Sequence, residues 1–462
     1  MTSGLEEPLS SMDVFQLMLL AAIVLFGVLV LALAAKDLWQ GCFLTVLVAT
    51  AAASTDLGPI SSALGTLRFP AFIVFALAAL NERAKYSKFV NGARPKKVVS
   101  VGTLLMTFLS ISALSLAVAD NSVGVLAQLG MLAVFVLALL VSAVRWRFAR
   151  LARSDIRLIN GTLTIFLVAG FLVLPLGLGF SGERFVGIFS NANTAGLVAT
   201  IVIPASVAIL KWGRSYLPII GIVAGTLTLL GSQARTSLLA LVVAFVVWGM
   251  LARGSAKGRA HVLVGGLALI AIGAFALVVS ERARSEFSSV FSRFELPEEG
   301  GLLLSGRETI WQAAFHVVNQ RPILGYGYGN SPPLSPGEIE QQIATGNAVR
   351  GIAANSYIQV LVETGLLGFA VIALVAGLLL VVSVQLMRSA ELGGIGALVF
   401  AGLLVQLTES PLLAPGQFYP WAFWFIALSS MMLLYRHRGS HQIDAHAGPG
   451  YAETDFGVGN GA

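Results

Sequence analysis

Charged residues are scarce in this chain of 462 residues. Asp, Glu, Lys and Arg together make up 11% of it, whereas an ordinary soluble domain carries roughly 25%. Hydrophobic residues make up 56%, and they recur in runs of about 18–25 residues, each long enough to cross the hydrocarbon core of a bilayer. The composition excludes a soluble globular protein and predicts an all-α, polytopic transmembrane helical bundle of about 12–13 spans.

Several kinds of chemistry lack the residues that they require. Cys42 is the single cysteine, so neither an intramolecular disulfide nor a thiolate metal cluster is expected. The chain has no GxxxxGK[ST] phosphate loop, no HExxH motif and no Asp-x-Asp, so we expect no ATP-driven transport by this chain, no metal and no cofactor. The stretch "GYGYGN" (325–330) follows no predicted strand, and we expect a tight turn there rather than a nucleotide loop.

Lys and Arg cluster in alternate connections between the apolar runs. The positive-inside rule places these connections in the cytoplasm, which accounts for the net charge of +6 without a nucleic-acid partner. The first run is too long for a cleaved signal peptide and is expected to be a retained helix. With 13 spans the N-terminus is outside, and with 12 it is inside. Candidate spans are 13–35, 38–55, 62–81, 98–118, 122–144, 158–180, 192–210, 215–232, 235–252, 260–280, 355–387, 391–409 and 418–435, and the basic connections are 82–97, 145–157, 211–214, 253–259 and 436–438.

The spans divide the chain into four parts. Residues 1–280 hold the first spans, to about the tenth, and 355–436 hold the last three. Between them, 281–354 form one large extracytoplasmic loop, in which helical spacing over 306–320 predicts a helix that ends before Pro322. Residues 437–462 are polar and glycine-rich, and we expect a disordered cytoplasmic tail.

Two outward segments carry polar groups at the mouths of spans. "GIFSNANT" opens a span with Asn191 and Asn193, which either cap the helix or line a cavity. "GSQARTSLLAL" (231–241) places Arg235 at the start of another span, where it is either a snorkelling anchor or an anion ligand.

Two further segments flank the ends of the outer loop. "SGRETIW" (305–311) puts Arg307 in the first turn of the loop helix, where an anion beside it would explain its presence. In "IAANSYIQVLVETGLLGF" (352–369), Asn355, Gln359 and Glu363 recur every fourth residue and share one helix face. Because ionisable groups in membrane helices usually face a cavity, we expect this stripe to line one, with interhelical hydrogen bonding as the alternative.

These four segments, in this order, resemble the sequence blocks of the O-antigen ligase and O-antigen polymerase superfamily. The blocks of that family are G-x-F-x-N-x-N, S-R-[ST]-x-L-L, G-R-x-x-x-W and H-N-x-x-L-x-x-x-x-E-x-G-x-x-G. The matching stretches here are "GIFSNANT", "ARTSLL", "GRETIW" and "NSYIQVLVETGLLG". The resemblance covers 182–369 by motif and the remainder by topology.

The resemblance implies a metal-independent membrane glycosyltransferase of the multi-span C type. Such proteins move a glycan from an undecaprenyl-diphosphate carrier to a glycan or lipid acceptor at the outer face of the bacterial inner membrane, and they can work within a polysaccharide-assembly complex. By the same resemblance, Arg235 and Arg307 hold the diphosphate. The other outward basic residues are also arginines, of which Arg184, Arg321 and Arg350 are further candidates.

One position departs from the family pattern. The histidine that precedes the Asn of the fourth block is Ala354 here, and alanine cannot carry a proton. His316 lies nine residues from Arg307, about 180° around an α-helix. Glu363 and Glu409 are the remaining acids that could act as base. We take Glu363 and Asn355 as the catalytic candidates, and Gln359, Asn191, Asn193 and Glu409 as cavity-lining residues.

The missing histidine leaves three interpretations open. In the first, Glu363 replaces the histidine as base, and in the second, positioning of the diphosphate suffices for catalysis. In the third, the chain is a non-catalytic relative that binds lipid-linked glycan. A polysaccharide or lipid transporter would share the apolar spans and outward arginines. The sequence does not distinguish a ligase from a polymerase, although the absence of the histidine favours a polymerase or a divergent branch of the family.

Overall fold

The computed structural model describes residues 32, 34–55, 59–87, 96–176, 178–182, 184–213, 215–252, 307–345 and 351–446. Over these residues the protein is all-α, as predicted, and its only sheet there is a two-stranded hairpin of β1 (Phe180–Ser181) and β2 (Arg184–Phe185). Two short 3₁₀ helices cover Ser115–Val118 and Leu174–Leu176. The helices are α3 (Leu38–Ala52), α4 (Pro59–Ser87), α5 (Lys96–Leu114), α6 (Ser122–Arg145), α7 (Ala149–Leu172), α8 (Ala192–Leu210), α9 (Leu217–Gly231), α10 (Arg235–Leu251), α13 (Arg307–Gln320), α14 (Pro336–Thr345), α15 (Ser356–Met387), α16 (Gly393–Val405) and α17 (Phe418–His446).

The helices are long and apolar enough for a polytopic membrane protein. Six segments in the described part could each cross a membrane by length and composition: Lys97–Val118, Ser122–Arg145, Ala149–Leu172, Ala192–Leu210, Ser356–Met387 and Phe418–Tyr435. Helices α3, α9, α10 and α16 are shorter and also apolar. The predicted span 260–280 and nearly all of 13–35 lie outside the described residues, so the count of 12–13 spans remains a prediction.

Most predicted spans coincide with helices to within a few residues, but α7 does not. It begins at Ala149, inside the segment 145–157 that the sequence predicts to be a connection, so the predicted start at residue 158 is wrong. The physical reason is that Asp155 is buried and pairs with Arg145, which lets a charged stretch continue a membrane helix. Helix α17 likewise continues to His446, into the predicted tail, whose remainder from 447 lies outside the described residues.

An aromatic cluster places α17 at the centre of the bundle. Phe425 of α17 lies 4.6 Å from Phe43 of α3 and 5.3 Å from Trp146 at the end of α6, measured between ring centroids. Trp421, one turn earlier, stacks on Phe72 of α4 at 5.0 Å. Of the residues in the span Phe418–Tyr435, 94% are buried, compared with 39% in an 18-residue apolar window of α15, so α17 is the axis around which other helices pack.

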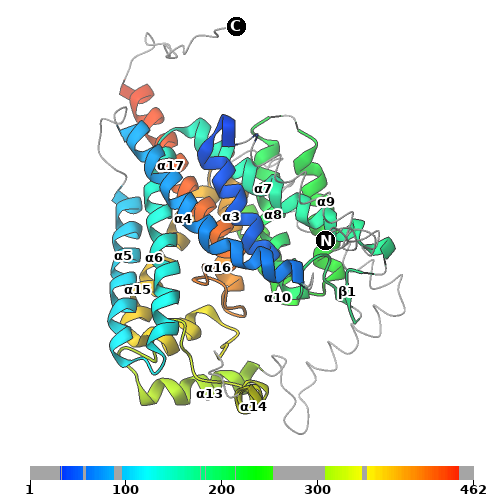
Figure 1. Cartoon of the computed structure of the whole chain (residues 1–462). Coiled ribbons are helices and arrows are strands. Elements are labelled where there is room, and N and C mark those ends of the chain that lie inside the picture. Colours follow the sequence, from blue (N-terminus) through cyan, green and yellow to red (C-terminus); the bar gives the residue numbers. More distant parts are fainter. Residues whose placement is uncertain are drawn as a thin grey trace, which may run out of the picture.

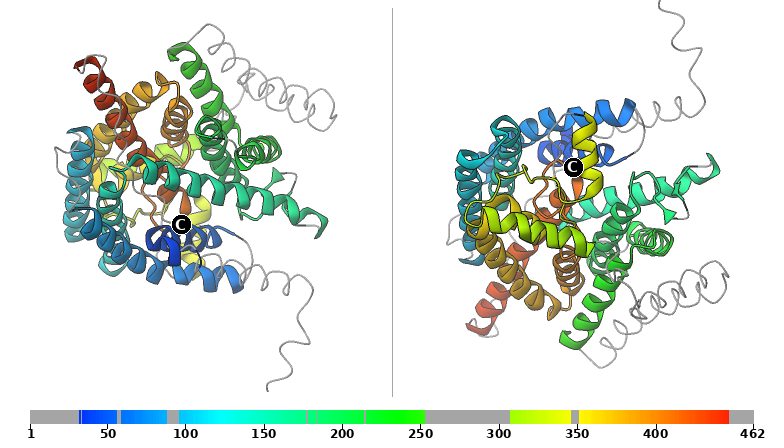
Figure 2. Two further views of the ribbon diagram at one scale, coloured as in Figure 1. Left: turned by 90° about the horizontal axis from the view of Figure 1, so that it is seen from above. Right: turned by 90° about the horizontal axis from the view of Figure 1, so that it is seen from below.

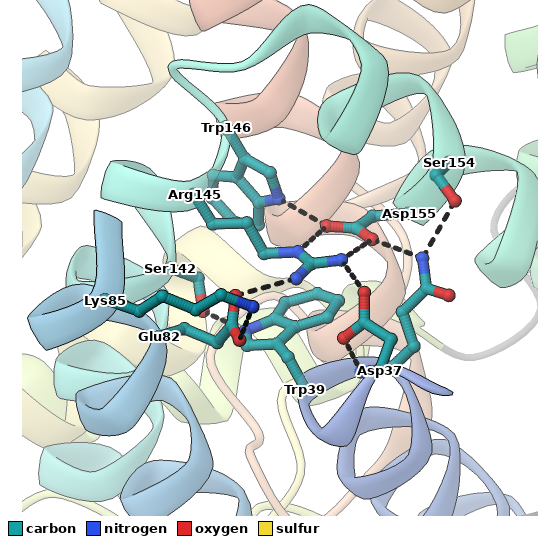
Figure 3. Close-up of polar contacts among 10 residues, drawn as sticks. Asp37, Trp39, Glu82, Lys85, Ser142, Arg145, Trp146, Ser154 and Asp155 are labelled. Carbon is teal, nitrogen blue, oxygen red and sulfur yellow. Dashed lines mark hydrogen bonds and ion pairs between the residues drawn. The ribbon is translucent and has the colours of Figure 1, made fainter. Parts of the chain in front are cut away.

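A buried arginine joins four helices at one end of this axis (Figure 3). The Arg145 side chain is 1% exposed and forms ion pairs with Asp37 at the start of α3 (2.5 Å), Glu82 of α4 (2.9 Å) and Asp155 of α7 (2.9 Å). Its guanidinium also lies 4.8 Å from the Trp39 ring. Removing these charges from water is costly unless they are paired, so the cluster fixes how α3, α4, α6 and α7 meet.

The basic connections gather at the same end of the bundle. Lys97 at the start of α5 donates to Gln385 near the end of α15, and Arg157 of α7 donates to the Trp212 carbonyl after α8. Lys211 bonds to the carbonyl of Ala390. Helix α8 separates this end from Asn193 by about 29 Å at 1.5 Å per residue. Helices α13 and α14 cross the opposite end (Figures 1 and 2), so the outer-loop helix and the basic connections lie on different sides.

Candidate functional site

Four side chains from distant parts of the chain form a hydrogen-bonded row at the end where α13 lies. Arg307 Nη2 donates to Glu409 Oε1 at 2.9 Å, and Asn193 Nδ2 donates to the same oxygen at 3.0 Å. Arg184 Nη2 donates to Asn193 Oδ1 at 2.7 Å. The row therefore links the loop after α16, the first turn of α13, the first turn of α8 and strand β2.

Local structure explains why these groups converge. Asn191 caps α8 by accepting from the Asn193 backbone N–H, which supports the capping alternative and orients the next turn. Arg184 Nε donates to the Ser232 carbonyl at 2.9 Å, in the turn that precedes α10. Helix α10 begins with Arg235, whose side chain is exposed. The tertiary structure thus brings the turn that carries Arg235 to the row of Arg184, Asn193, Glu409 and Arg307.

The site carries more positive than negative charge. Arg307 and Glu409 are 18% and 17% exposed at their side chains, so their ion pair is partly shielded from water yet open to a ligand. Burial raises the pKa of the Glu409 carboxyl, while Arg307, Arg184 and the Asn193 hydrogen bond act in the opposite direction. One guanidinium on the carboxylate, a second that reaches it through Asn193, and Arg235 in the neighbouring turn form a site suited to an anion.

The position of the missing histidine adjoins Glu409. The Ser356 backbone N–H donates to the Glu409 carbonyl at 2.9 Å, and the Asn355 N–H donates to Ser410 Oγ at 2.9 Å. Asn355 Nδ2 also bonds to the Leu407 carbonyl, while its side-chain oxygen caps α15. Ala354 itself has a φ of 47°, a left-handed conformation that histidine adopts more readily than alanine does.

The polar stripe is buried rather than open. Gln359 Nε2 donates to Glu363 Oε1 at 2.6 Å, and Ser331 Oγ donates to the same oxygen at 3.0 Å. The Gln359 side-chain oxygen accepts from the Ala353 N–H at 2.7 Å. Glu363 is 2% exposed. These contacts lie within α15 or join it to the loop residues Ser331 and Ala353, so they are not the interhelical bonds of the alternative. They correct the expectation that Gln359 and Glu363 line an open cavity, because both side chains already have partners within the protein.

Glu363 stands beside a break in α15. Gly365 has φ 63° and ψ −166°, so the helical hydrogen bonding is interrupted there. The turn after α13 supplies the missing hydrogen bonds. The N–H groups of Tyr326 and Gly327 donate to the carbonyls of Val362 and Glu363, both at 3.0 Å. The Leu366 N–H donates to the Pro322 carbonyl at 2.8 Å. The expected turn at 325–330 is confirmed, and its function is to satisfy backbone groups freed by the break, as membrane helices require.

The remaining candidates lie elsewhere. Arg321 pairs with Asp120 at 3.1 Å and stacks on Tyr326, at the far end of α13 from Arg307. His316 is exposed on an unbroken helix, so it faces away from the site as predicted. Arg350 lies outside the described residues. The acid that contacts Arg307 is Glu409. Sequence spacing does not favour it over Glu363 as the base, because Glu409 lies at the end of a different predicted span.

Comparison with protein families identifies one segment of the chain. Residues 220–373 match a family model described as O-antigen ligase, whereas a search of the curated proteins found nothing similar. The matched segment holds Arg235, Arg307, the polar stripe and the break at Gly365, and it ends before Glu409. Over this segment the chain is similar to the O-antigen ligase family, which agrees with the resemblance of its sequence blocks.

Proposed function

We propose that this protein is a metal-independent glycosyltransferase that moves a glycan from a polyprenyl diphosphate, such as undecaprenyl diphosphate, to a hydroxyl group of an acceptor. The observation that carries the proposal is the convergence of Arg307 and, through Asn193, Arg184 on the half-buried carboxylate of Glu409. The acceptor is the growing end of a glycan in a polymerase, or a lipid in a ligase.

The diphosphate binds where the arginines converge. Guanidinium groups grip phosphate oxygens through pairs of parallel hydrogen bonds, and Arg307 turns from Glu409 to the donor when the donor enters. Arg235, at the start of α10, binds from the neighbouring turn. As the bond between the sugar carbon and the diphosphate oxygen breaks, negative charge grows on the leaving group, and fixed guanidiniums stabilise that charge. Arginine thereby takes the part that a divalent cation plays in metal-dependent transferases.

Glu409 accepts the proton of the acceptor hydroxyl. The acceptor oxygen forms a bond to the sugar carbon, its proton passes to a Glu409 carboxylate oxygen, and the lipid diphosphate leaves with the electron pair of the broken bond. Burial raises the pKa of this carboxyl, which makes it a stronger base than an exposed glutamate. The Ser356 N–H donates to the Glu409 backbone carbonyl, and Ser356 lies two residues after Ala354, the position at which the family has its histidine.

Glu363 has a different role in this proposal. Its 2% exposure and its bonds to Gln359 and Ser331 leave no approach for an acceptor hydroxyl. It stabilises the break in α15, which in turn holds α13 and Arg307 against the bundle.

The site faces the side of the membrane opposite the basic connections. By the positive-inside rule that side is extracytoplasmic, which agrees with a donor displayed at the outer face of a bacterial inner membrane. Membrane lipid surrounds the helices, and the acceptor approaches from the side of α13. A polysaccharide-assembly complex would supply the donor and remove the product.

The proposal is tested with purified protein, lipid-linked glycan and acceptor in detergent, with and without a metal chelator. We expect bond formation in both cases. Glu409→Gln should abolish transfer, and adding Ala354→His to that variant should restore part of it, because imidazole then occupies the family position. Full transfer by Glu409→Gln would contradict the assignment of the base. Movement of donor across vesicles without any bond formation would instead identify a transporter.

A deletion strain separates the two kinds of acceptor. Accumulated single repeat units on the lipid carrier would identify a polymerase, and full-length chains left on the carrier would identify a ligase. A normal surface-polysaccharide profile together with an inactive purified protein would identify a non-catalytic relative.

A further inference from the structure

A groove on the flank of the bundle lies far from the site described above. It runs between α5 and α6, reaches Met432 of α17, and encloses a volume of about 480 Å³, within the range of roughly 300–1,000 Å³ of ligand pockets. Apolar side chains such as Val99, Met106 and Leu137 line it. These three are also exposed at the surface of the bundle, so the groove opens sideways toward the surroundings of the helices rather than into the core.

Two arginines belong to the lining of this groove. Arg83 follows Glu82 on α4, and Arg147 comes two residues after Arg145. Because Glu82 and Arg145 form a buried ion pair at 2.9 Å, the ends of α4 and α6 are held together and the two arginines are delivered to the same end of the groove. This is the end at which the basic connections gather, where a bilayer has its head groups.

We infer that the groove binds an anionic phospholipid of the leaflet that faces the basic connections. Its phosphate lies between Arg83 and Arg147, and one acyl chain follows Val99, Met106 and Leu137 between α5 and α6. A soluble anion would leave the apolar lining uncovered, and a lipid without net negative charge would be attracted less strongly by the two guanidiniums. Basic pockets between membrane helices bind anionic head groups in this manner. The inference does not depend on the proposed glycosyl transfer.

The test uses the full-length protein, stripped of lipid in detergent, with thermal unfolding and native mass spectrometry as readouts. Phosphatidylglycerol should raise the midpoint of unfolding and remain bound in the mass spectrum. Phosphatidylcholine and glycerol phosphate should do neither, because the first lacks net negative charge and the second lacks the acyl chain. Equal effects of phosphatidylglycerol and phosphatidylcholine would overturn the inference. Tighter binding of a polyprenyl phosphate than of phosphatidylglycerol would also overturn it.

Variants distinguish binding in this groove from a general attraction of anionic lipid to the protein surface. Arg83→Gln combined with Arg147→Gln should weaken phosphatidylglycerol binding about tenfold, since each guanidinium supplies charge-assisted hydrogen bonds. Leu137→Trp fills the groove and keeps both charges, and it should weaken binding by a similar factor. The matched control is Arg150→Gln, an exposed arginine in the first turn of α7 that does not line the groove. Equal losses in the control and the double variant, or normal binding by Leu137→Trp, would show adsorption without a site.

Discussion

The guanidinium of Arg307 and the carboxylate of Glu409 lie 2.9 Å apart although 102 residues separate them in the sequence. Arg307 opens the helix of the outer loop, and Glu409 follows α16. Their contact, together with the Asn193 and Arg184 bonds, assembles a cationic site at one end of the bundle from four separate segments. The predictions on catalysis follow from this pair.

Arg307→Lys should lower the rate of glycan transfer about 100- to 1,000-fold, the usual effect of removing one group that stabilises developing charge. Lysine keeps the charge but cannot grip a diphosphate with two parallel hydrogen bonds. Transfer is measured in detergent with lipid-linked donor. Arg321→Lys is the control, because Arg321 pairs with Asp120 at the other end of α13, and it should retain near-normal transfer. Comparable losses in both variants would argue against a diphosphate at Arg307.

The pH dependence of transfer should follow the Glu409 carboxyl. The carboxylate accepts a proton only when ionised, so transfer should fall as the pH is lowered through a pKa that burial raises above the usual glutamate value. Arg184 lowers this pKa. Arg184→Gln should therefore move the acid limb of the rate profile to higher pH, in addition to slowing the reaction. An acid limb that keeps its position in Arg184→Gln would assign the titration to another group.

Gly365→Ala should destabilise the protein by about 1–3 kcal/mol, the cost of forcing an ordinary residue into a rare backbone conformation. The added Cβ would also collide with the carbonyl of Ile323. The matched control is Gly377→Ala in the same helix, where nothing lies near the added atom and alanine favours the helix. Thermal unfolding in detergent compares the two variants. Equal stability would mean that the break in α15 is not needed.

Arg145→Leu should cost about 3–5 kcal/mol or prevent folding, because it leaves the buried carboxylate of Asp155 without its cation and Glu82 with only Lys85 at 3.9 Å. Arg153→Leu is the comparison: Arg153 pairs with Glu391 at the surface, where an ion pair contributes about 0–1 kcal/mol. Yield of folded protein and the unfolding midpoint report the difference. If Arg145→Leu folded as well as Arg153→Leu, the cluster would not be what joins the four helices.

The sequence predicted the helices of this protein better than their contacts. The bounds of α8, α10 and α13 lie within a residue or two of the predicted ones, since apolar run length, capping Asn191 and Pro322 are local signals. The predicted start of α7 was wrong because Asp155, in the charged first part of the helix, pairs with Arg145. No local signal in the sequence reveals that partner.

For the candidate site, too, the sequence predicted individual residues better than their contacts. Arg307, Arg235 and the stripe of Asn355, Gln359 and Glu363 could be singled out because charge and amide groups are unusual in apolar runs. Their surroundings could not: the sequence offered Glu363 as base, whereas the structure buries it against Gln359 and places Glu409 on Arg307.

By itself the sequence determined that the chain lies in a membrane, where most of its apolar segments lie, and which of their ends carry the positive charge, because these depend on the transfer of each segment from water to hydrocarbon. Only the tertiary structure decided which carboxylate meets Arg307 and which one is buried beside the break in α15. That choice depends on how helices from distant parts of the chain pack, and the spacing of residues along one helix contains no information about its neighbours.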